Sequence, residues 1–285
     1  MNSTLVGLAT FGNLKYTKIT IESIIENTER EVDFFVVVGK PWDKATAEWL
    51  TEKKIPFVAH TKNMGFPYSV NDIYDYAWVH YDYDNLIIVG NDIYAYPTTV
   101  DSLIDLAEKS DYEVISALQY DVRSLYSEYE ETRELIDRRT HTVLDLTTEP
   151  WKKFTGWGGE QQIADMSLYD IQNMCLYKKE VFKKIGYTDV NFFPAYFIDN
   201  DYARRLVKAN IKVCSLVNAR FFHFWSRTLK EETGASNTGY FRNNEKYYKS
   251  KWGGVFGKET RVPELGIFSR EHEEATIDTW RKVSR

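Results

Sequence analysis

The sequence has few cysteines and no long apolar run. Only 2 cysteines occur among its 285 residues, Cys175 and Cys214, and each lies in a short apolar stretch that predicts a buried thiol. This favours a reducing compartment. No apolar run approaches the length that crosses a bilayer, and no basic leader with an apolar core precedes the first predicted strand. We therefore expect a cytoplasmic protein without a membrane span.

The sequence also lacks an excess of positive charge. Its formal net charge is −6, which gives no general attraction to polyanions, so nucleic-acid binding would need a local basic patch. With 43% hydrophobic residues, the chain can bury a substantial core at about the upper size of one α/β domain. We expect one large domain, or one domain with an appendage.

Short apolar runs alternate with helical patterns in the first 110 residues. The apolar runs at 5–9, 32–38, 55–59 and 86–89 are predicted strands, and helical spacing follows at 16–28, 43–50 and 70–79. Such alternation predicts an α/β fold with a mostly parallel, Rossmann-like central sheet, right-handed crossovers and flanking helices.

The later part of the chain breaks this rhythm. Residues 120–165 are charged and loop-rich, which predicts an inserted helical and loop segment. The alternation of strands and helices then resumes. It is predicted from a helix at 179–185, a helix that begins at Asp199 and a strand at 211–217. We expect residues 1–228 to form the catalytic domain, and 229–285 a C-terminal extension that packs on it or contacts an acceptor.

Polar residues follow the predicted strands. Because parallel strands end at one edge of a sheet, these side chains are expected to line one cleft. They are Thr10, Asn13, Asp43, Asn63, Asn71, Asn91 and Asp92.

Asp92 and His223 are candidate metal ligands. A carboxylate at the end of a buried strand needs a cation, amide donors or a metal to offset its desolvation. The residues leave two roles open for Asp92, capping the next turn or binding a hard divalent ion together with a diphosphate. His223 lies in an aromatic setting typical of a core imidazole. Its position behind an acidic helix start also suits an ion such as Mn²⁺ or Mg²⁺.

Asp199 and Asp201 are candidate catalytic acids at the start of a helix. Acidic residues are common there, because the helix dipole and the free amides favour them. Both cannot be the N-cap, however, and a carboxylate that points into a cleft can accept a proton from an attacking hydroxyl.

In the order of these elements the chain resembles the inverting, metal-dependent glycosyltransferases of family 2, which have the GT-A fold. The likeness runs in fragments from Leu5 to about Pro263. The fragments are residues 10–11 with 21–24, 43–50, 63–66 with Asn71, 90–93 with Pro97, 177–186, 199–201 with Arg205, His223, and 247–254.

The resemblance implies roles for several positions. Asp92 would be the last acid of the metal motif, Asp199 the catalytic base and His223 a metal or diphosphate contact. The nucleotide pocket would include Thr10, Asp43 and Asn63. The donor would be a nucleotide sugar, a UDP-sugar first, with Mn²⁺ or Mg²⁺.

The chain departs from the family pattern at three places. Gly90 and Asn91 leave the metal motif with one carboxylate, and Ile198 replaces the Glu that usually precedes the base. Gly39 stands where an Asp often contacts the nucleotide. The thinned motif keeps open a non-catalytic carbohydrate-binding protein with a degenerate fold. A nucleotidyltransferase is a weaker alternative. Such enzymes usually have a glycine-rich, basic loop after the first strand, and the loop at residues 10–15 has one Gly and one Lys.

The acceptor is not specified by these residues. The loop with Trp157, Gly158 and Gly159 could cover an acceptor, which we expect to be a saccharide. Modified DNA is an alternative through the segment Arg242–Lys258, where lysines and aromatic residues interleave. The competing interpretation of that segment, which we prefer, is a helix that packs its rings on the domain.

Overall fold

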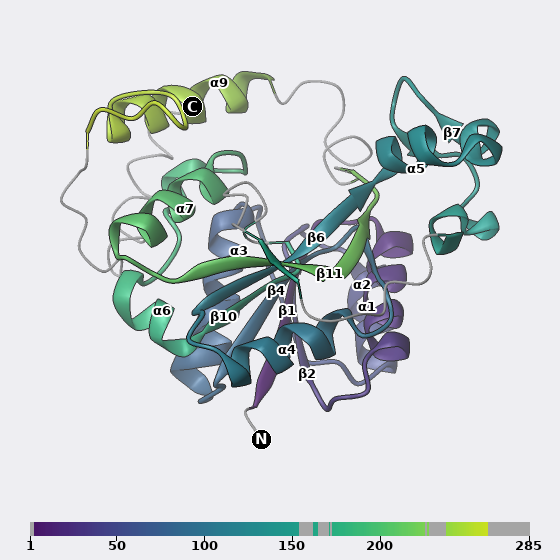
Figure 1. Ribbon diagram of the computed structural model, residues 1–285, viewed down its shortest axis with the longest axis horizontal. Coiled ribbons are helices and arrows are strands. Elements are labelled where there is room, and N and C mark those ends of the chain that lie inside the picture. The colour runs from purple at the N-terminus through teal and green to yellow at the C-terminus, as the bar shows by residue number, and fades with distance from the viewer. Residues whose placement is uncertain are drawn as a thin grey trace.

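The computed structural model describes residues 3–153, 162–164, 171, 173–225, 227 and 238–261. In this part of the chain a twisted sheet lies between two layers of helices (Figure 1). Its strands lie in the order β3 (Phe57–Ala59), β2 (Asp33–Val38), β1 (Thr4–Thr10), β4 (Asn85–Gly90), β10 (Cys175–Lys178), β6 (Val114–Asp121), β11 (Val213–His223) and β5 (Ile93–Ala95), and β9 (Ile163–Ala164) also pairs with β11.

Most of these strands run in one direction. β3, β2, β1 and β4 pair in parallel, and so do β6 and β11. β10 runs antiparallel between β4 and β6, and β5 and β9 run antiparallel to β11. The mostly parallel α/β sheet predicted from the sequence is therefore confirmed. Residues that follow the parallel strands meet at one edge of the sheet, which we call the carboxyl edge.

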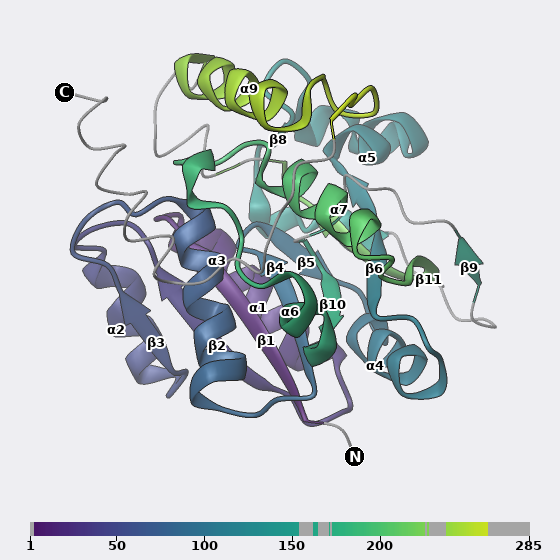
Figure 2. The same ribbon diagram turned by 90° about the vertical axis from the view of Figure 1, so that its left-hand side faces the viewer.

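The helices cover both faces of the sheet, as Figure 2 shows. One layer contains α1 (Leu14–Asn27), α2 (Lys44–Glu52) and α4 (Thr99–Lys109); the other contains α3 (Phe66–Tyr74) with its π-helical continuation η1 (Asp75–His80), α6 (Lys179–Ile185) and α7 (Ile198–Lys208). Along β1, Leu5 packs with the α3 layer, whereas Val6 and Leu8 pack with the α1 layer. This alternation buries both faces, which explains why the strands are almost continuously apolar.

β11 is longer than the sequence indicated. The strand was expected at 211–217, but β11 spans Val213–His223, with a register shift against β6 between Leu216 and Arg220. Such a bulge lets a strand continue after a local break in its pairing. His223 is therefore the last residue of the strand, opposite Asp121 on β6.

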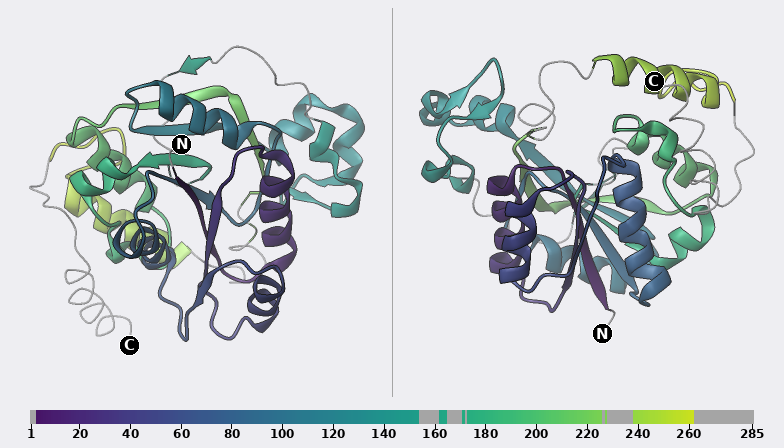
Figure 3. Two further views of the ribbon diagram at one scale, coloured as in Figure 1. Left: turned by 90° about the horizontal axis from the view of Figure 1, so that it is seen from below. Right: turned by 180° about the vertical axis from the view of Figure 1, so that it is seen from behind.

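The predicted insertion leaves the sheet at the end of β6. It contains α5 (Val122–Glu128), the 3-10 helices η2 (Glu130–Leu135), η3 (Leu146–Thr148) and η4 (Pro150–Lys153), and a short hairpin of β7 (Ile136–Asp137) and β8 (Thr142–Val143). In Figure 3 it stands beside α1 in both views. Its buried Trp151 packs with Tyr16 of α1 and Phe224, which follows β11.

The helix α9 (Thr238–Trp252) belongs to the C-terminal extension and lies over α7 at the carboxyl edge (Figures 1 and 2). Its Tyr248 and Trp252 are buried against Ile198 of α7 and Phe192, the last residue of the 3-10 turn η5 (Val190–Phe192). The division into a domain of residues 1–228 and an extension of residues 229–285 stays a prediction.

The structure also bears on the cysteines and on the search for a membrane span. Cys175 and Cys214 are buried free thiols, as predicted, and burial raises the pKa of Cys214 to about 11. Within the described ranges, the structure contains no helix that is both long and apolar enough to span a bilayer.

Candidate functional site

Thr10 and Asn91 meet at the carboxyl edge. Thr10 ends β1, and its hydroxyl oxygen accepts a hydrogen bond of 3.2 Å from the Asn91 side-chain amide, just after β4. The same hydroxyl donates to the carbonyl of Gly12 at 2.9 Å and lies 2.9 Å from the Thr17 hydroxyl. The Gly39 amide, just after β2, donates to the Thr10 carbonyl at 2.8 Å. These bonds fix the shape of the loop after β1.

Asp92 and His223 also meet at this edge. Asp92 lies between β4 and β5 and is only 6% exposed. Its Oδ1 is 3.1 Å from His223 Nε2, and its Oδ2 accepts a 2.8 Å hydrogen bond from the Arg227 amide. The Asp92 carboxylate therefore joins the end of β11 and the residues after it, instead of capping the turn at residues 94–98.

Gln119 holds the other side of the His223 ring. It lies on β6, and its Oε1 is 3.0 Å from His223 Nδ1. A carbonyl oxygen can only accept, so this contact requires a proton on Nδ1. The Asp92 oxygen facing Nε2 can also only accept, so a proton, or a metal in its place, must lie between Nε2 and Asp92 Oδ1. A metal bound to Nε2 while Nδ1 donates to a protein acceptor is the arrangement that metal-binding histidines usually have. We call Asp92, His223 and Gln119 the Asp92 centre.

The Asp92 centre fits a divalent ion as a partial ligand shell. Two ligand atoms at right angles around an ion with bonds of about 2.1 Å lie about 3 Å apart, close to the 3.1 Å between Asp92 Oδ1 and His223 Nε2. Among the described residues, no group of three or more His, Cys, Asp or Glu side chains could hold a metal. Mg²⁺ commonly binds through one or two carboxylates, waters and phosphate oxygens. The donor set therefore suits a metal that also binds a diphosphate.

Buried Arg227 ties the insertion to this centre. Its guanidinium donates to the Thr142 hydroxyl and to the carbonyls of His141 at 2.9 Å and Thr140 at 3.1 Å. Its backbone amide binds Asp92. One residue thus joins the β7–β8 hairpin to the candidate metal ligand, and the insertion supports the site instead of standing apart from it.

Trp225 and Arg123 lie beside the Asp92 centre, with the centres of the Trp225 and His223 rings 6.1 Å apart. The Arg123 guanidinium lies 3.8 Å above the centre of the Trp225 ring, and Asp121 at the end of β6 accepts two hydrogen bonds from it. Burial raises the pKa of the Asp121 carboxyl, but the bonds from Arg123 and from the first amides of α5 outweigh this and lower it. Asp121 is committed to capping α5.

Asp199 and Asp201 have different surroundings although both lie in the first turn of α7. Asp199 is half-buried, and its Oδ1 accepts a 2.9 Å hydrogen bond from the Asn200 amide. Asp201 is 1% exposed. Its Oδ1 is 2.6 Å from Lys251 Nζ and 2.9 Å from Trp252 Nε1.

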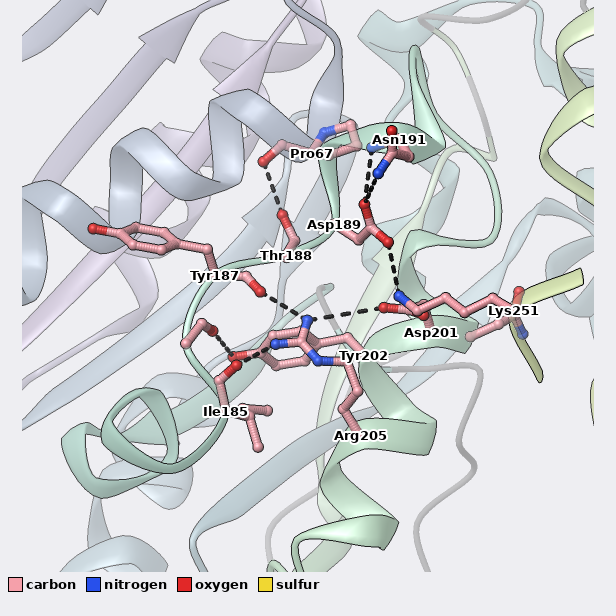
Figure 4. Close-up of polar contacts among 12 residues, drawn as sticks. Pro67, Ile185, Tyr187, Thr188, Asp189, Asn191, Asp201, Tyr202, Arg205 and Lys251 are labelled. Carbon is pink, nitrogen blue, oxygen red and sulfur yellow. Dashed lines mark hydrogen bonds and ion pairs between the residues drawn. The ribbon is translucent and has the colours of Figure 1, made fainter. Parts of the chain in front are cut away.

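Asp201 belongs to a buried group of charges that we call the Lys251 network: Asp189, Asp201, Arg205 and Lys251 (Figure 4). Lys251 Nζ is 2.7 Å from Asp189 Oδ2 as well as bound to Asp201, and Arg205 Nη1 lies 3.8 Å from Asp201 Oδ2. Arg205 also donates to the carbonyls of Ile185 and Tyr187. Burial raises the Asp189 pKa, but the charge and hydrogen bond of Lys251 outweigh this and lower it. We assign Asp201 a structural role.

The other predicted pocket residues have structural surroundings that explain them. Asp43 caps α2 by accepting from the Thr46 amide at 3.1 Å, and exposed Asn63 accepts from the Gly65 amide at 2.9 Å. Asn13 begins α1 in the left-handed conformation. Fully buried Asn71 bonds the amide and carbonyl of Thr188, which leaves it no nucleotide-facing atom. Trp157, Gly158 and Gly159 lie outside the described residues.

The segment Arg242–Lys258 turns its aromatic residues and one of its lysines inward. Tyr248 and Trp252 are buried in the core with Ile198, and Lys251 is committed to two carboxylates. Lys249 pairs with Glu245 at 2.9 Å. This is the packed helix that the sequence favoured, and it gives the DNA alternative no support.

Three residues of the site were missed by sequence reasoning: Gln119, Arg227 and Lys251. Period-two alternation places Gln119 on the same face of its strand as Asp121. The α9 residues Asn244, Tyr248, Lys251 and Trp252 have the i, i+4, i+7, i+8 spacing of a buried helix face. That spacing could have indicated Lys251. No local pattern marks Arg227.

Comparisons with known proteins support the fold. No protein-family model matches the sequence, and no curated protein matches it. The structure is similar to a crystal structure of S. aureus TarS residues 1–349, with a TM-score of 0.53 and 12% identity over 87% of this chain and 72% of that one. It is also similar to GalNAc-T7 crystallised with UDP, GalNAc and Mn²⁺, with a TM-score of 0.60 and 10% identity over 89% of this chain and 49% of that one. The predicted GT-A fold is thereby confirmed.

Proposed function

We propose that this protein transfers a sugar from a nucleoside-diphosphate sugar to an acceptor hydroxyl, with inversion at the anomeric carbon. The observation that carries this proposal is the approach of Asp92 Oδ1 and His223 Nε2 to 3.1 Å at the carboxyl edge of the sheet. These residues come from segments 131 positions apart in the sequence. The similarity in fold to TarS and GalNAc-T7 supports a glycosyltransferase over a nucleotidyltransferase.

The residues of the chain divide the work of such a reaction. Asp92 and His223 would hold a divalent ion, which when bound neutralises the charge of the departing diphosphate. Gln119 keeps the His223 ring in the orientation that this requires. Asp199 would accept the proton of the acceptor hydroxyl as that oxygen attacks in line, so that no protein nucleophile is needed.

UDP and Mn²⁺ are the donor nucleotide and metal to test first. The resemblance in sequence implies a UDP-sugar, and the GalNAc-T7 structure contains UDP and Mn²⁺. For the acceptor we propose a saccharide. The partly exposed aromatic residues Tyr240 and Phe241 of α9 are of the kind that contacts sugar faces.

The test is release of nucleoside diphosphate from a panel of nucleotide sugars, with and without Mn²⁺ and candidate saccharides. We expect Asp199→Asn to keep donor affinity while turnover falls by about 10²–10⁴-fold, the usual contribution of general-base catalysis. Glu180→Gln, which alters an exposed ion pair on α6, is the matched control and should be unchanged.

Two outcomes would count against the proposal. Equal turnover of Asp199→Asn and the parent protein would remove Asp199 as the base. Saccharide binding without hydrolysis or transfer of any donor would instead identify a non-catalytic carbohydrate-binding protein. This alternative stays open because the metal motif has a single carboxylate.

A further inference from the structure

We propose that Lys251 of the C-terminal extension is a positioning residue for Asp199. By bridging Asp189 and Asp201, it fixes the first turn of α7 and therefore the carboxylate that would act as base. This rests on the proposed function in so far as Asp199 is the base. Lys251 itself touches no reacting group.

Local bonds shape the first turn of α7 but do not fix its place in the fold: the Asn200 amide donates to Asp199 Oδ1 at 2.9 Å and the Asp201 amide to the Phe197 carbonyl at 2.9 Å. The N-cap residue of α7 is Phe197, which provides no side-chain hydrogen bond to the helix. Phe197 and Tyr196 both have left-handed backbone conformations, with φ of 64° and 72°. Residues other than glycine rarely adopt this backbone conformation, and it persists only where surrounding contacts hold it. The position of the turn must therefore come from tertiary contacts.

Those contacts come from α9. Asp201 Oδ1 is bound by Lys251 Nζ at 2.6 Å and by Trp252 Nε1 at 2.9 Å, and Ile198 packs with Trp252. Lys251 Nζ is also 2.7 Å from Asp189, whose other oxygen accepts the Asn191 amide at 3.0 Å and so anchors the segment before α7. One ammonium group thus holds both the segment that leads into α7 and the turn that carries Asp199.

Charge balance makes Lys251 hard to replace. The side chains of Asp189, Asp201 and Lys251 are 3%, 1% and 8% exposed, and that of Arg205 is 2% exposed. Two negative and two positive groups therefore cancel inside the protein. Removing Lys251 leaves a net charge of −1 among the remaining three groups, and an uncompensated buried carboxylate must then attract water, a proton or another partner. Asp189 loses its contact with the ammonium group, and Asp201 loses its 2.6 Å contact while the Arg205 guanidinium remains 3.8 Å away.

Two variants separate positioning from stability. Lys251→Met removes the ammonium but keeps much of the packing of its alkyl chain. The double variant Lys251→Met/Asp189→Asn removes one charge of each sign and leaves Asp201 with Arg205, whose Nη1 lies 3.8 Å from Asp201 Oδ2. Lys249→Met removes a lysine two residues away whose partner Glu245 is at the surface, and it serves as the matched control.

We expect Lys251→Met to lower the Tm by about 5–10 °C, the scale of an unpaired buried charge. Turnover with the best donor should fall by about 10–100-fold without a change in donor KM, as for a small misplacement of a catalytic group. Backbone amides of the first turn of α7 should exchange with deuterium at least about tenfold faster. The double variant should recover Tm but not turnover, and Lys249→Met should change neither.

Other results would overturn the proposal. If turnover returns together with Tm in the double variant, the network serves stability alone. If Lys251→Met exchanges its α7 amides as slowly as the parent protein, Lys251 does not hold the turn. The exchange measurement needs no activity, so absence of donor turnover in the parent protein would reject the proposed function while this measurement still decides the role of Lys251.

Discussion

Replacing Gln119 by Leu should weaken metal binding at the Asp92 centre. Gln119 Oε1 lies 3.0 Å from His223 Nδ1, whereas Nε2 faces Asp92 Oδ1 at 3.1 Å. Leu has about the size of Gln but no acceptor, so the substitution removes the contact that keeps the proton on Nδ1. The neutral ring can then carry its proton on Nε2 instead of Nδ1. In that tautomer Nε2 has no free electron pair, so it cannot bind a metal.

The expected loss is about tenfold in Mn²⁺ affinity. Loss of one hydrogen bond of this kind costs about 0.5–1.5 kcal/mol, and loss of an outer partner of a metal-binding histidine typically costs about 10–100-fold. The lower end applies here for two reasons. The His223 side chain is partly exposed, at 19%, so water can replace the lost acceptor, and Asp92 still orients the ring from the other side.

The assay is titration of free Mn²⁺, followed by its electron paramagnetic resonance signal, with UDP present to complete the ligand shell. Gln119→Glu retains an acceptor oxygen at this position and should bind Mn²⁺ at least as tightly as the parent protein. If Gln119→Leu keeps both its Tm and the parental Mn²⁺ affinity, then Gln119 does not orient the ring and the histidine is not organised for a metal.

Two further predictions concern stability. Gly7→Ala should destabilise the fold by about 1–3 kcal/mol or more, because a Cβ there would lie 2.2 Å from Ile73 Cγ2; a change in unfolding free energy below about 0.5 kcal/mol would contradict this. The lowered pKa values of Asp189 and Asp121 add stability that is fully present above their ordinary pKa of 3.8 and lost as pH falls below it. Thermal unfolding from pH 7 to 3 should show this loss, and a Tm that rises below pH 4 would refute it.

The mostly parallel character of the sheet could be predicted because the strands are short, apolar and separated by helical periods, whereas the antiparallel pairings of β10, β5 and β9 were not predicted. The same logic brought Asp92 and His223 to one edge, since both follow or end strands that run in the same direction. The end of β11 was not predictable in this way. Its bulge between Leu216 and Arg220 depends on pairing with β6, which is a property of two distant segments and not of either alone.

The pair Asp199 and Asp201 shows where local reasoning stops. Both acids have the same signal in the sequence, a carboxylate at a helix start. Two positions along a helix differ by about 200° in direction, so only one of them can face a cleft when the other is buried. The structure decides which, because the partners of Asp201 lie about 50 residues away on α9, at Lys251 and Trp252.

Two predicted pocket residues make local bonds. Asp43 and Asn63 are short polar side chains next to turns, where they bond backbone amides two or three residues further on, whereas Asn71 lies within α3 and bonds Thr188 from a distant segment. A polar residue after a strand is therefore ambiguous between loop structure and ligand binding. Thr10 and Asn91 differ because each bonds the other across two adjacent strands, which places both at the same point of the edge.

The late part of the chain organises the site that the early strands expose. Asp92 belongs to the alternating strands and helices of the first 110 residues, but its two oxygens contact His223 and Arg227. Asp199 is held through Asp201 by Lys251. Without His223 and Arg227, the buried Asp92 carboxylate would have neither of these partners, at a cost of several kcal/mol. The extension therefore has a physical reason to remain docked: Lys251 lies buried between two carboxylates, and separating α9 from α7 would take its ammonium group away from both.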